Sequence, residues 1–182
     1  KTAVLSDLKI DIMLITDSIM RHIEEEDVKF RQYRTNFERI DKTYVSQLKD
    51  PQLHDKITKQ KPHLIYVHLG INDIHSGSTA TKVVKEIKAF VNFIYDKSER
   101  TKLIISCPLQ NGNAHHHATI EDACQDLLKM DNSRRNRRIF IQINDHFHGV
   151  DEQGARAQTP RYFHHDKLHL SNQGKRAMVC NF

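Results

Sequence analysis

The sequence has few cysteines and no long apolar run, and each of these scarcities excludes a class of protein. Its three cysteines are odd in number and are not spaced as in metal sites or redox motifs: Cys107, Cys124 and Cys180. They argue against a disulfide framework and favour a reducing setting, intracellular and cytoplasmic. The apolar runs are far shorter than the ~20 residues that span a bilayer, and the N-terminus lacks the pattern of a signal peptide. We therefore expect no transmembrane segment.

The composition is that of one globular domain. The 182 residues are 38% hydrophobic and 28% charged, which suits a single core. We predict one domain over residues 1–182, cut from a longer protein, because the chain begins without Met and stops inside a helical pattern. The net charge is +5, and the densest basic cluster can bind phosphates, although a solvated loop is the commoner explanation. That cluster consists of Arg134, Arg135, Arg137 and Arg138.

Short apolar runs alternate with segments of helical spacing. The runs predict strands at residues 10–16, 28–33, 63–69, 102–106 and 138–143, of which the second lies at or near an edge. Helices are predicted at residues 42–48, 52–60, 78–97, 119–130 and 171–180. Parallel strands need crossover connections that pack on both faces of the sheet. The pattern therefore predicts a three-layer α/β/α sandwich with a mainly parallel, flavodoxin-like sheet of five strands.

The first strand ends at the most informative stretch of the chain. Its apolar run stops abruptly at Thr16-Asp17-Ser18, and helix-compatible residues follow. Ser18 is thus expected where a buried parallel strand turns into a helix. Unpaired N–H groups at a helix start favour negative charge, so a hydroxyl there can act as a nucleophile beside an anion site. An ordinary N-cap pair is the alternative, and on this stretch alone it is the commoner one.

Two later stretches supply the other groups that acyl transfer needs. Asn72 follows a predicted strand and can present its side-chain amide beside the Ser18 N–H, while Gly70 lets the backbone approach closely. Asp166 and His169 are three residues apart, so the carboxylate can bind one imidazole nitrogen while the other faces Ser18. Each stretch alone is more often a surface turn. Their order along the chain and their places after strands favour a catalytic site.

These stretches resemble a known family. Thr16-Asp17-Ser18, Gly70-Ile71-Asn72-Asp73 and Asp166-Lys167-Leu168-His169 are similar to the first, third and fifth sequence blocks of the SGNH (GDSL-type) hydrolases, over nearly the whole chain. Within that family the chain looks most like the esterase-like domains of some non-LTR retrotransposon proteins. The resemblance implies the SGNH hydrolase fold and a serine esterase without a cofactor. Its substrates would be carboxylic esters, acyl or acetyl, that are small or lipid-like.

The same resemblance implies a role for each motif residue. Ser18 would be the nucleophile, His169 the general base and then acid, and Asp166 the group that orients the imidazole. The oxyanion hole would combine the backbone N–H of Ser18 with the side chain of Asn72, beside Gly70. The reaction would pass through an acyl-enzyme at Ser18.

The sequence departs from the family pattern in two places. Thr16 stands where the first block usually has glycine, which leaves the nucleophile in place. The second block contributes a glycine N–H to the oxyanion hole, and no glycine occurs between residues 28 and 42. Losing one oxyanion donor typically costs ~10²–10³ in rate, so the missing glycine leaves weak or absent activity open. Asp17 and Asp73 are expected to shape turns and cap helices. The residues that could replace the missing N–H are Arg34, Thr35 and Asn36.

A catalytically weak or inactive SGNH-like domain that binds RNA or a protein partner is the alternative, and an esterase within a nucleic-acid-associated protein is a third possibility. The positive charge favours RNA, whereas the presence together of Ser18, Asn72, Asp166 and His169 favours an enzyme. The chain also holds thirteen histidines, including the run at 115–117. Consecutive histidines in a polar loop do not converge by themselves, so we expect no metal ion.

Overall fold

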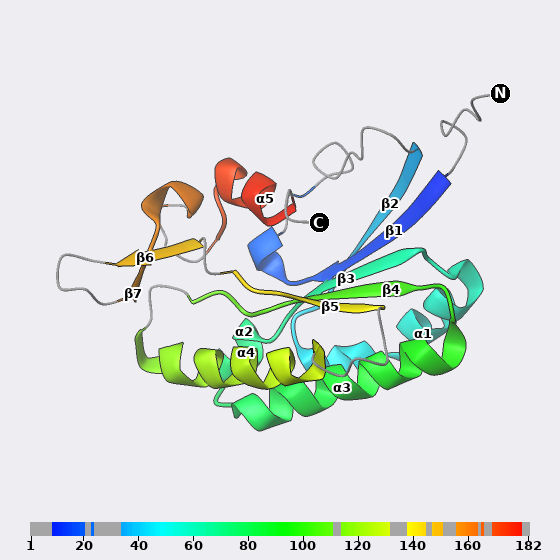
Figure 1. The fold of residues 1–182 in the computed structure, drawn as a ribbon, viewed down its shortest axis with the longest axis horizontal. Coiled ribbons are helices and arrows are strands. Elements are labelled where there is room, and N and C mark those ends of the chain that lie inside the picture. The colour runs from blue at the N-terminus through cyan, green and yellow to red at the C-terminus, as the bar shows by residue number, and fades with distance from the viewer. Residues whose placement is uncertain are drawn as a thin grey trace.

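A computed structural model provides the structure of the protein. It describes residues 9–20, 23, 34–110, 114–131, 138–144, 147–150, 156–163, 165 and 169–179. Five parallel strands form the central sheet in the order β2-β1-β3-β4-β5 (Figure 1). The strands are β1 (Lys9–Thr16), β2 (Arg34–Asp41), β3 (Leu64–His68), β4 (Lys102–Ser106) and β5 (Ile139–Gln142). The predicted flavodoxin-like sheet is confirmed.

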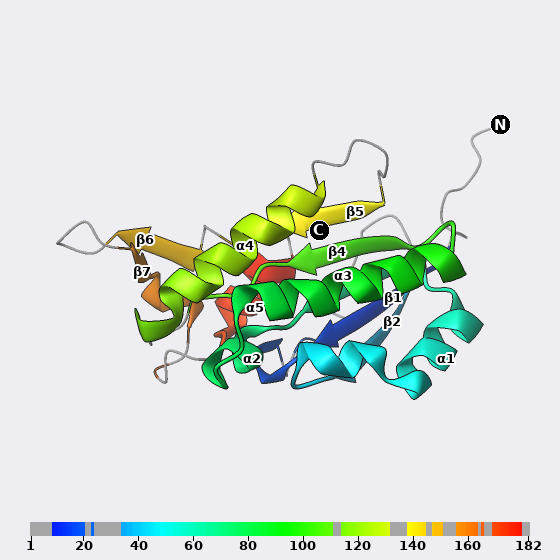
Figure 2. The same ribbon diagram turned by 90° about the horizontal axis from the view of Figure 1, so that it is seen from below.

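Helices cover both faces of this sheet. The α-helices are α1 (Pro51–Gln60), α2 (Ile71–His75), α3 (Ala80–Lys97), α4 (His117–Asp131) and α5 (Asn172–Val179). Figure 1 shows α1, α3 and α4 below the sheet and α5 above it, and Figure 2 shows α3 and α4 side by side. Short 3-10 turns form η2 (Ser18–Met20), η4 (Val45–Lys49), η5 (Ala114–His116) and η7 (Pro160–Tyr162). No helix in the described ranges is long and apolar enough to cross a membrane.

The core lies mainly between the sheet and the lower helices. The apolar stripe predicted for the long helix is fully buried in α3: Val83, Val84, Ile87, Phe90, Val91 and Ile94. Both faces of β1 are covered, because Ile12, Met13, Leu14 and Ile15 are each at most 3% exposed. This explains why the β1 sequence is a continuous apolar run rather than an alternating one.

Two segments differ from the sequence-based expectation. The strand predicted at 28–33 lies outside the described residues, and the edge strand beside β1 is instead β2, at residues 34–41. The sequence analysis predicted no strand after residue 143, whereas β6 (His148–Val150) and β7 (Arg156–Gln158) form a small antiparallel pair. This hairpin lies beyond the carboxyl end of the central sheet (Figure 1).

Candidate active site

Ser18 lies in the predicted place, at the turn between β1 and η2. The turn is shaped by Asp17, whose Oδ1 accepts a hydrogen bond from the Ile19 N–H at 3.0 Å. Such an Asp caps the following turn and leaves the intervening residue facing outward. Ser18 is partly exposed between Asp17 and Ile19, which are 3% and 2% exposed. Ser18 therefore lies, partly exposed, at the carboxyl end of β1.

Asn72 lies in α2, directly after β3, the strand next to β1. Gly70 precedes the helix with φ of +116°, and a Cβ there would lie 2.9 Å from Cγ1 of Val83. Only glycine adopts this conformation without strain, so Gly70 shapes the turn that brings Asn72 to the sheet edge. The Asn72 Nδ2 group donates to Asp17 Oδ2 at 3.3 Å and to the Thr43 carbonyl oxygen at 3.2 Å. Asn72 is thus held against the Ser18 turn.

The carboxyl group of Asp17 connects three parts of the chain. Burial raises its pKa from 3.8 to about 7, while the Ile19 N–H and the positive charge of His169 act in the opposite direction. The interaction with His169 shows that this residue also lies near the Ser18 turn. Turn shaping and capping by Asp17 is confirmed by the bond to Ile19, but the sequence did not predict its contact with Asn72.

His169 is held by the segment that precedes α5. Leu170 pairs with Phe163 in an antiparallel bridge, and the Ser171 N–H donates to the Tyr162 carbonyl oxygen at 2.9 Å. Ser171 also caps α5, because its hydroxyl accepts from the Gly174 N–H at 3.1 Å. Asp166, predicted to orient His169, lies outside the described residues.

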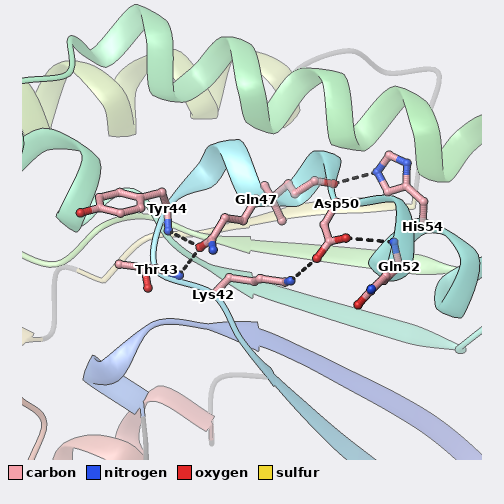
Figure 3. Close-up of polar contacts among 8 residues, drawn as sticks. Lys42, Thr43, Tyr44, Gln47, Asp50, Gln52 and His54 are labelled. Atoms are coloured by element: carbon pink, nitrogen blue, oxygen red, sulfur yellow. Dashed lines mark hydrogen bonds and ion pairs between the residues drawn. The ribbon is translucent and has the colours of Figure 1, made fainter.

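The loop after β2 lies at the same end of the sheet as the Ser18 turn, because Asp41 pairs with Thr16 at the end of β1. Figure 3 shows its residues from Lys42 to Tyr44 turning back toward η4. The N–H groups of Thr43 and Tyr44 both donate to Gln47 Oε1, at 2.6 and 3.0 Å. The Lys42 N–H donates to the Thr16 carbonyl oxygen, and the Val45 N–H to Asp73 Oδ2. Each backbone donor of this loop is therefore engaged inside the protein.

The expectation that Arg34, Thr35 or Asn36 supplies the missing N–H is wrong. These residues begin β2 and pair with Lys9, Ile10 and Asp11, at the opposite end of β1 from Ser18. The carboxyl end of β2, where Asp41 pairs with Thr16, is the end near Ser18. The Ser18 N–H and the Asn72 amide stay the predicted oxyanion donors.

A buried polar cluster that the sequence analysis missed lies at the same end of the sheet. His68 ends β3 and its Nδ1 lies 2.9 Å from the Ser106 hydroxyl, which also accepts from Asn144 Nδ2 at 2.9 Å. The imidazole is 1% exposed, and burial lowers the pKa of His68 to about 4. Met178 of α5 closes the cluster, with its sulfur 3.7 Å from the Ser106 oxygen. His68 is thus a neutral structural histidine.

Other predicted groups lie away from Ser18. Of the arginine cluster only Arg138 is described; its guanidinium stacks 4.4 Å from the Tyr95 ring centroid and donates to the Ser98 carbonyl oxygen. Residues 134, 135 and 137 lie outside the described ranges. His116 contacts the rings of His75 and His115, but no three ligating side chains in the described part of the chain are arranged to hold a metal ion.

Two hollows on the surface also lie away from the predicted catalytic groups. One is lined by both described cysteines, Cys107 and Cys124, with Pro108 and Ile120 between the end of β4 and α4. The other lies at the opposite end of the sheet, beside Asp11 and Glu38. Ser18, Asn72 and His169 line neither of them.

No protein-family model and no curated protein matches this sequence. Solved structures match the fold over nearly its whole length. A carbohydrate esterase of family 3 from Talaromyces cellulolyticus has a TM-score of 0.68 and 15% identity, covering 94% of this chain and 93% of its own. The family 3 carbohydrate esterase of Clostridium thermocellum has a TM-score of 0.67 and 13% identity, covering 95% and 92%. A GDSL-like lipase from Bacteroides thetaiotaomicron has a TM-score of 0.65 and 14% identity, covering 93% and 84%. The chain therefore has the α/β/α fold of the SGNH (GDSL-type) hydrolases.

Proposed function

We propose that the protein is a serine esterase that hydrolyses carboxylic esters through an acyl-enzyme at Ser18. The observation that carries the proposal is the place of Asp17, which adjoins Ser18, bonds to Asn72 and interacts with the charge of His169. These relations of Asp17 to Asn72 and His169 support a site at the Ser18 turn. Ser18, Asn72 and His169 each have the chemistry that one step of acyl transfer needs.

In the proposed reaction the Ser18 hydroxyl attacks the ester carbonyl while His169 takes its proton. The oxyanion of the tetrahedral intermediate accepts hydrogen bonds from the Ser18 N–H and the Asn72 amide. Collapse of the intermediate releases the alcohol, which receives the proton from His169. A water molecule then repeats the sequence on the acyl group and regenerates Ser18. Asp166 is proposed to orient His169 throughout.

The hydrogen bonds of the loop after β2 affect the rate that we expect. The N–H groups from Lys42 to Val45 lie at the same end of the sheet and each has an acceptor, so one of them could act as a third oxyanion donor only by giving up that acceptor, as Asn72 must give up Thr43. Since one oxyanion donor is worth ~10²–10³ in rate, we expect turnover to be slow compared with enzymes that have three donors. Acetyl esters are the first substrates to test, including acetylated sugars, because two of the structural neighbours are carbohydrate esterases.

Hydrolysis of p-nitrophenyl acetate and longer p-nitrophenyl esters by wild type, Ser18→Ala, Asn72→Ala and His169→Ala tests the proposal. We expect Ser18→Ala and His169→Ala to abolish turnover and Asn72→Ala to lower kcat by ~10²-fold or more. Circular dichroism of each variant checks that it is folded. Equal turnover by folded wild type and folded Ser18→Ala would refute the proposal.

RNA binding remains a prediction that rests on the net charge and the arginine cluster. The described arginine of that cluster, Arg138, already packs on Tyr95 and bonds to the backbone at Ser98. No observation within the described residues therefore favours RNA binding over the esterase, nor a link to retrotransposon proteins.

A further inference from the structure

We propose that Asp17 is a positioning residue of the reaction, whose single buried carboxyl group orients both oxyanion donors. This inference rests on the proposed esterase function of the Ser18 site. It adds a residue to which the catalytic scheme gives no role beyond shaping the turn.

The two oxygen atoms of Asp17 have separate partners. Oδ1 accepts from the Ile19 N–H at 3.0 Å and so fixes the turn that aims the Ser18 N–H. Oδ2 accepts from the Asn72 Nδ2 group at 3.3 Å and so fixes the plane of that amide. One side chain, 3% exposed, thereby couples the ends of two neighbouring strands, β1 and β3.

The second N–H of Asn72 is the one that substrate can reach. It donates to the Thr43 carbonyl oxygen, and this bond is exposed, whereas the bond to Asp17 is partly buried. An incoming oxyanion can replace the exposed Thr43 acceptor while Asp17 keeps hold of the other N–H. Holding a donor in place before the reaction is what makes an oxyanion hole effective, because little reorganisation is then needed.

The role depends on two acceptors, which only a carboxyl group provides. In Asp17→Asn the new amide has one acceptor and one donor group, so whichever way it turns, an N–H faces either Ile19 N–H or Asn72 Nδ2. In Asp17→Ser the short hydroxyl still caps the turn at Ile19 but has no second oxygen for Asn72. The serine variant therefore separates the two functions of Asp17.

The test is a double-mutant cycle of Asp17→Ser and Asn72→Ala, measured by kcat and KM for p-nitrophenyl acetate. We expect Asp17→Ser to lower kcat by about 10- to 100-fold with KM nearly unchanged. The reason is that the misplaced Asn72 amide weakens a hydrogen bond made to the oxyanion and not to the bound ester. In the Asn72→Ala background the same change should lower kcat by less than about threefold. Equal effects in both backgrounds would overturn the inference, since a purely structural loss would act independently of Asn72.

A second measurement needs no activity and separates failure of this inference from failure of the proposed function. The carboxyl carbon of Asp17 is titrated by ¹³C NMR in wild type and in Asn72→Ala. Loss of the donor Asn72 should raise the pKa of Asp17, and an unchanged pKa would overturn the contact itself. If wild type is inactive but the pKa moves, the esterase proposal fails while the Asp17–Asn72 contact stands. Asp17→Asn is the further variant should Asp17→Ser not fold.

Discussion

The buried imidazole of His68 makes a defined contribution to the acid sensitivity of the fold. His68 is 1% exposed at the end of β3, and its Nε2 has no hydrogen-bond partner among the described residues. Burial lowers its pKa from 6.5 to about 4, because the charged imidazolium would lose its hydration inside the protein. The folded protein therefore keeps this histidine neutral at pH values where the unfolded chain protonates it.

The sign and size of the effect follow from the two pKa values. Above pH 6.5 the imidazole is neutral in both states, so it adds no pH dependence. As the pH falls from 6.5 to 4, the unfolded chain binds a proton that the folded protein does not, and the free energy of unfolding decreases. A difference of about 2.5 between the pKa values corresponds to a loss of about 3 kcal/mol over this range.

Urea unfolding of wild type and His68→Gln at pH 7.5 and pH 4.5 measures this contribution. Glutamine keeps a polar group near Ser106 but does not titrate, so the variant should lose about 2–3 kcal/mol less stability than wild type between the two pH values. His63→Gln, which changes a histidine whose side chain is 54% exposed, is the matched control and should behave like wild type. The same pH dependence in wild type and His68→Gln would refute the account of a neutral buried imidazole.

Three further predictions concern the turns and the carboxyl group around the site. Gly70→Ala should lower the free energy of unfolding by about 1–3 kcal/mol in urea titrations, because its φ is +116°; an unchanged midpoint would contradict this. Gly174→Ala should lower the thermal midpoint and kcat together, since a Cβ there would lie 2.0 Å from the Tyr162 carbonyl oxygen and displace α5 from the segment before it. The pKa of Asp17 is raised to about 7, so the free energy of unfolding of wild type should fall by up to about 4 kcal/mol relative to that of Asp17→Asn as the pH rises from 4 to 7. Parallel curves of unfolding free energy against pH for the two proteins would contradict this.

The central strands could be predicted because their residues are buried on both faces. Runs such as Ile65-Tyr66-Val67 are continuously apolar, so they can be recognised without knowing which elements pack against them. The edge strand β2 was not predicted, because it has only one neighbour. Its residues from Thr35 to Asp41 are all at least partly exposed and show no clean alternation. The segment at 28–33 alternates better, and pairing with β1, not local pattern, selects residues 34–41.

Ser18 and Asn72 could be placed at the same edge of the sheet because each follows the end of a predicted strand. The contacts between these two stretches could not be predicted, because the bond from Asn72 to Asp17 spans 55 positions in the sequence. The loop after β2 did carry one readable signal. Gln47 follows Tyr44 by three residues, the spacing of a capping residue that turns back to bind N–H groups at a helix start. That spacing could have indicated that the loop donors are used internally.

Labelling with a fluorophosphonate probe tests the central claim most directly, because the probe reacts only with a serine activated as a nucleophile. Wild type, Ser18→Ala and Ser78→Ala would be treated and the modified peptide identified by mass spectrometry; Ser78 is a partly exposed serine outside the site. The account predicts one modification, on Ser18, in wild type and Ser78→Ala, and none in Ser18→Ala. Folded wild type that is not labelled, or labelling that persists in Ser18→Ala, would contradict it.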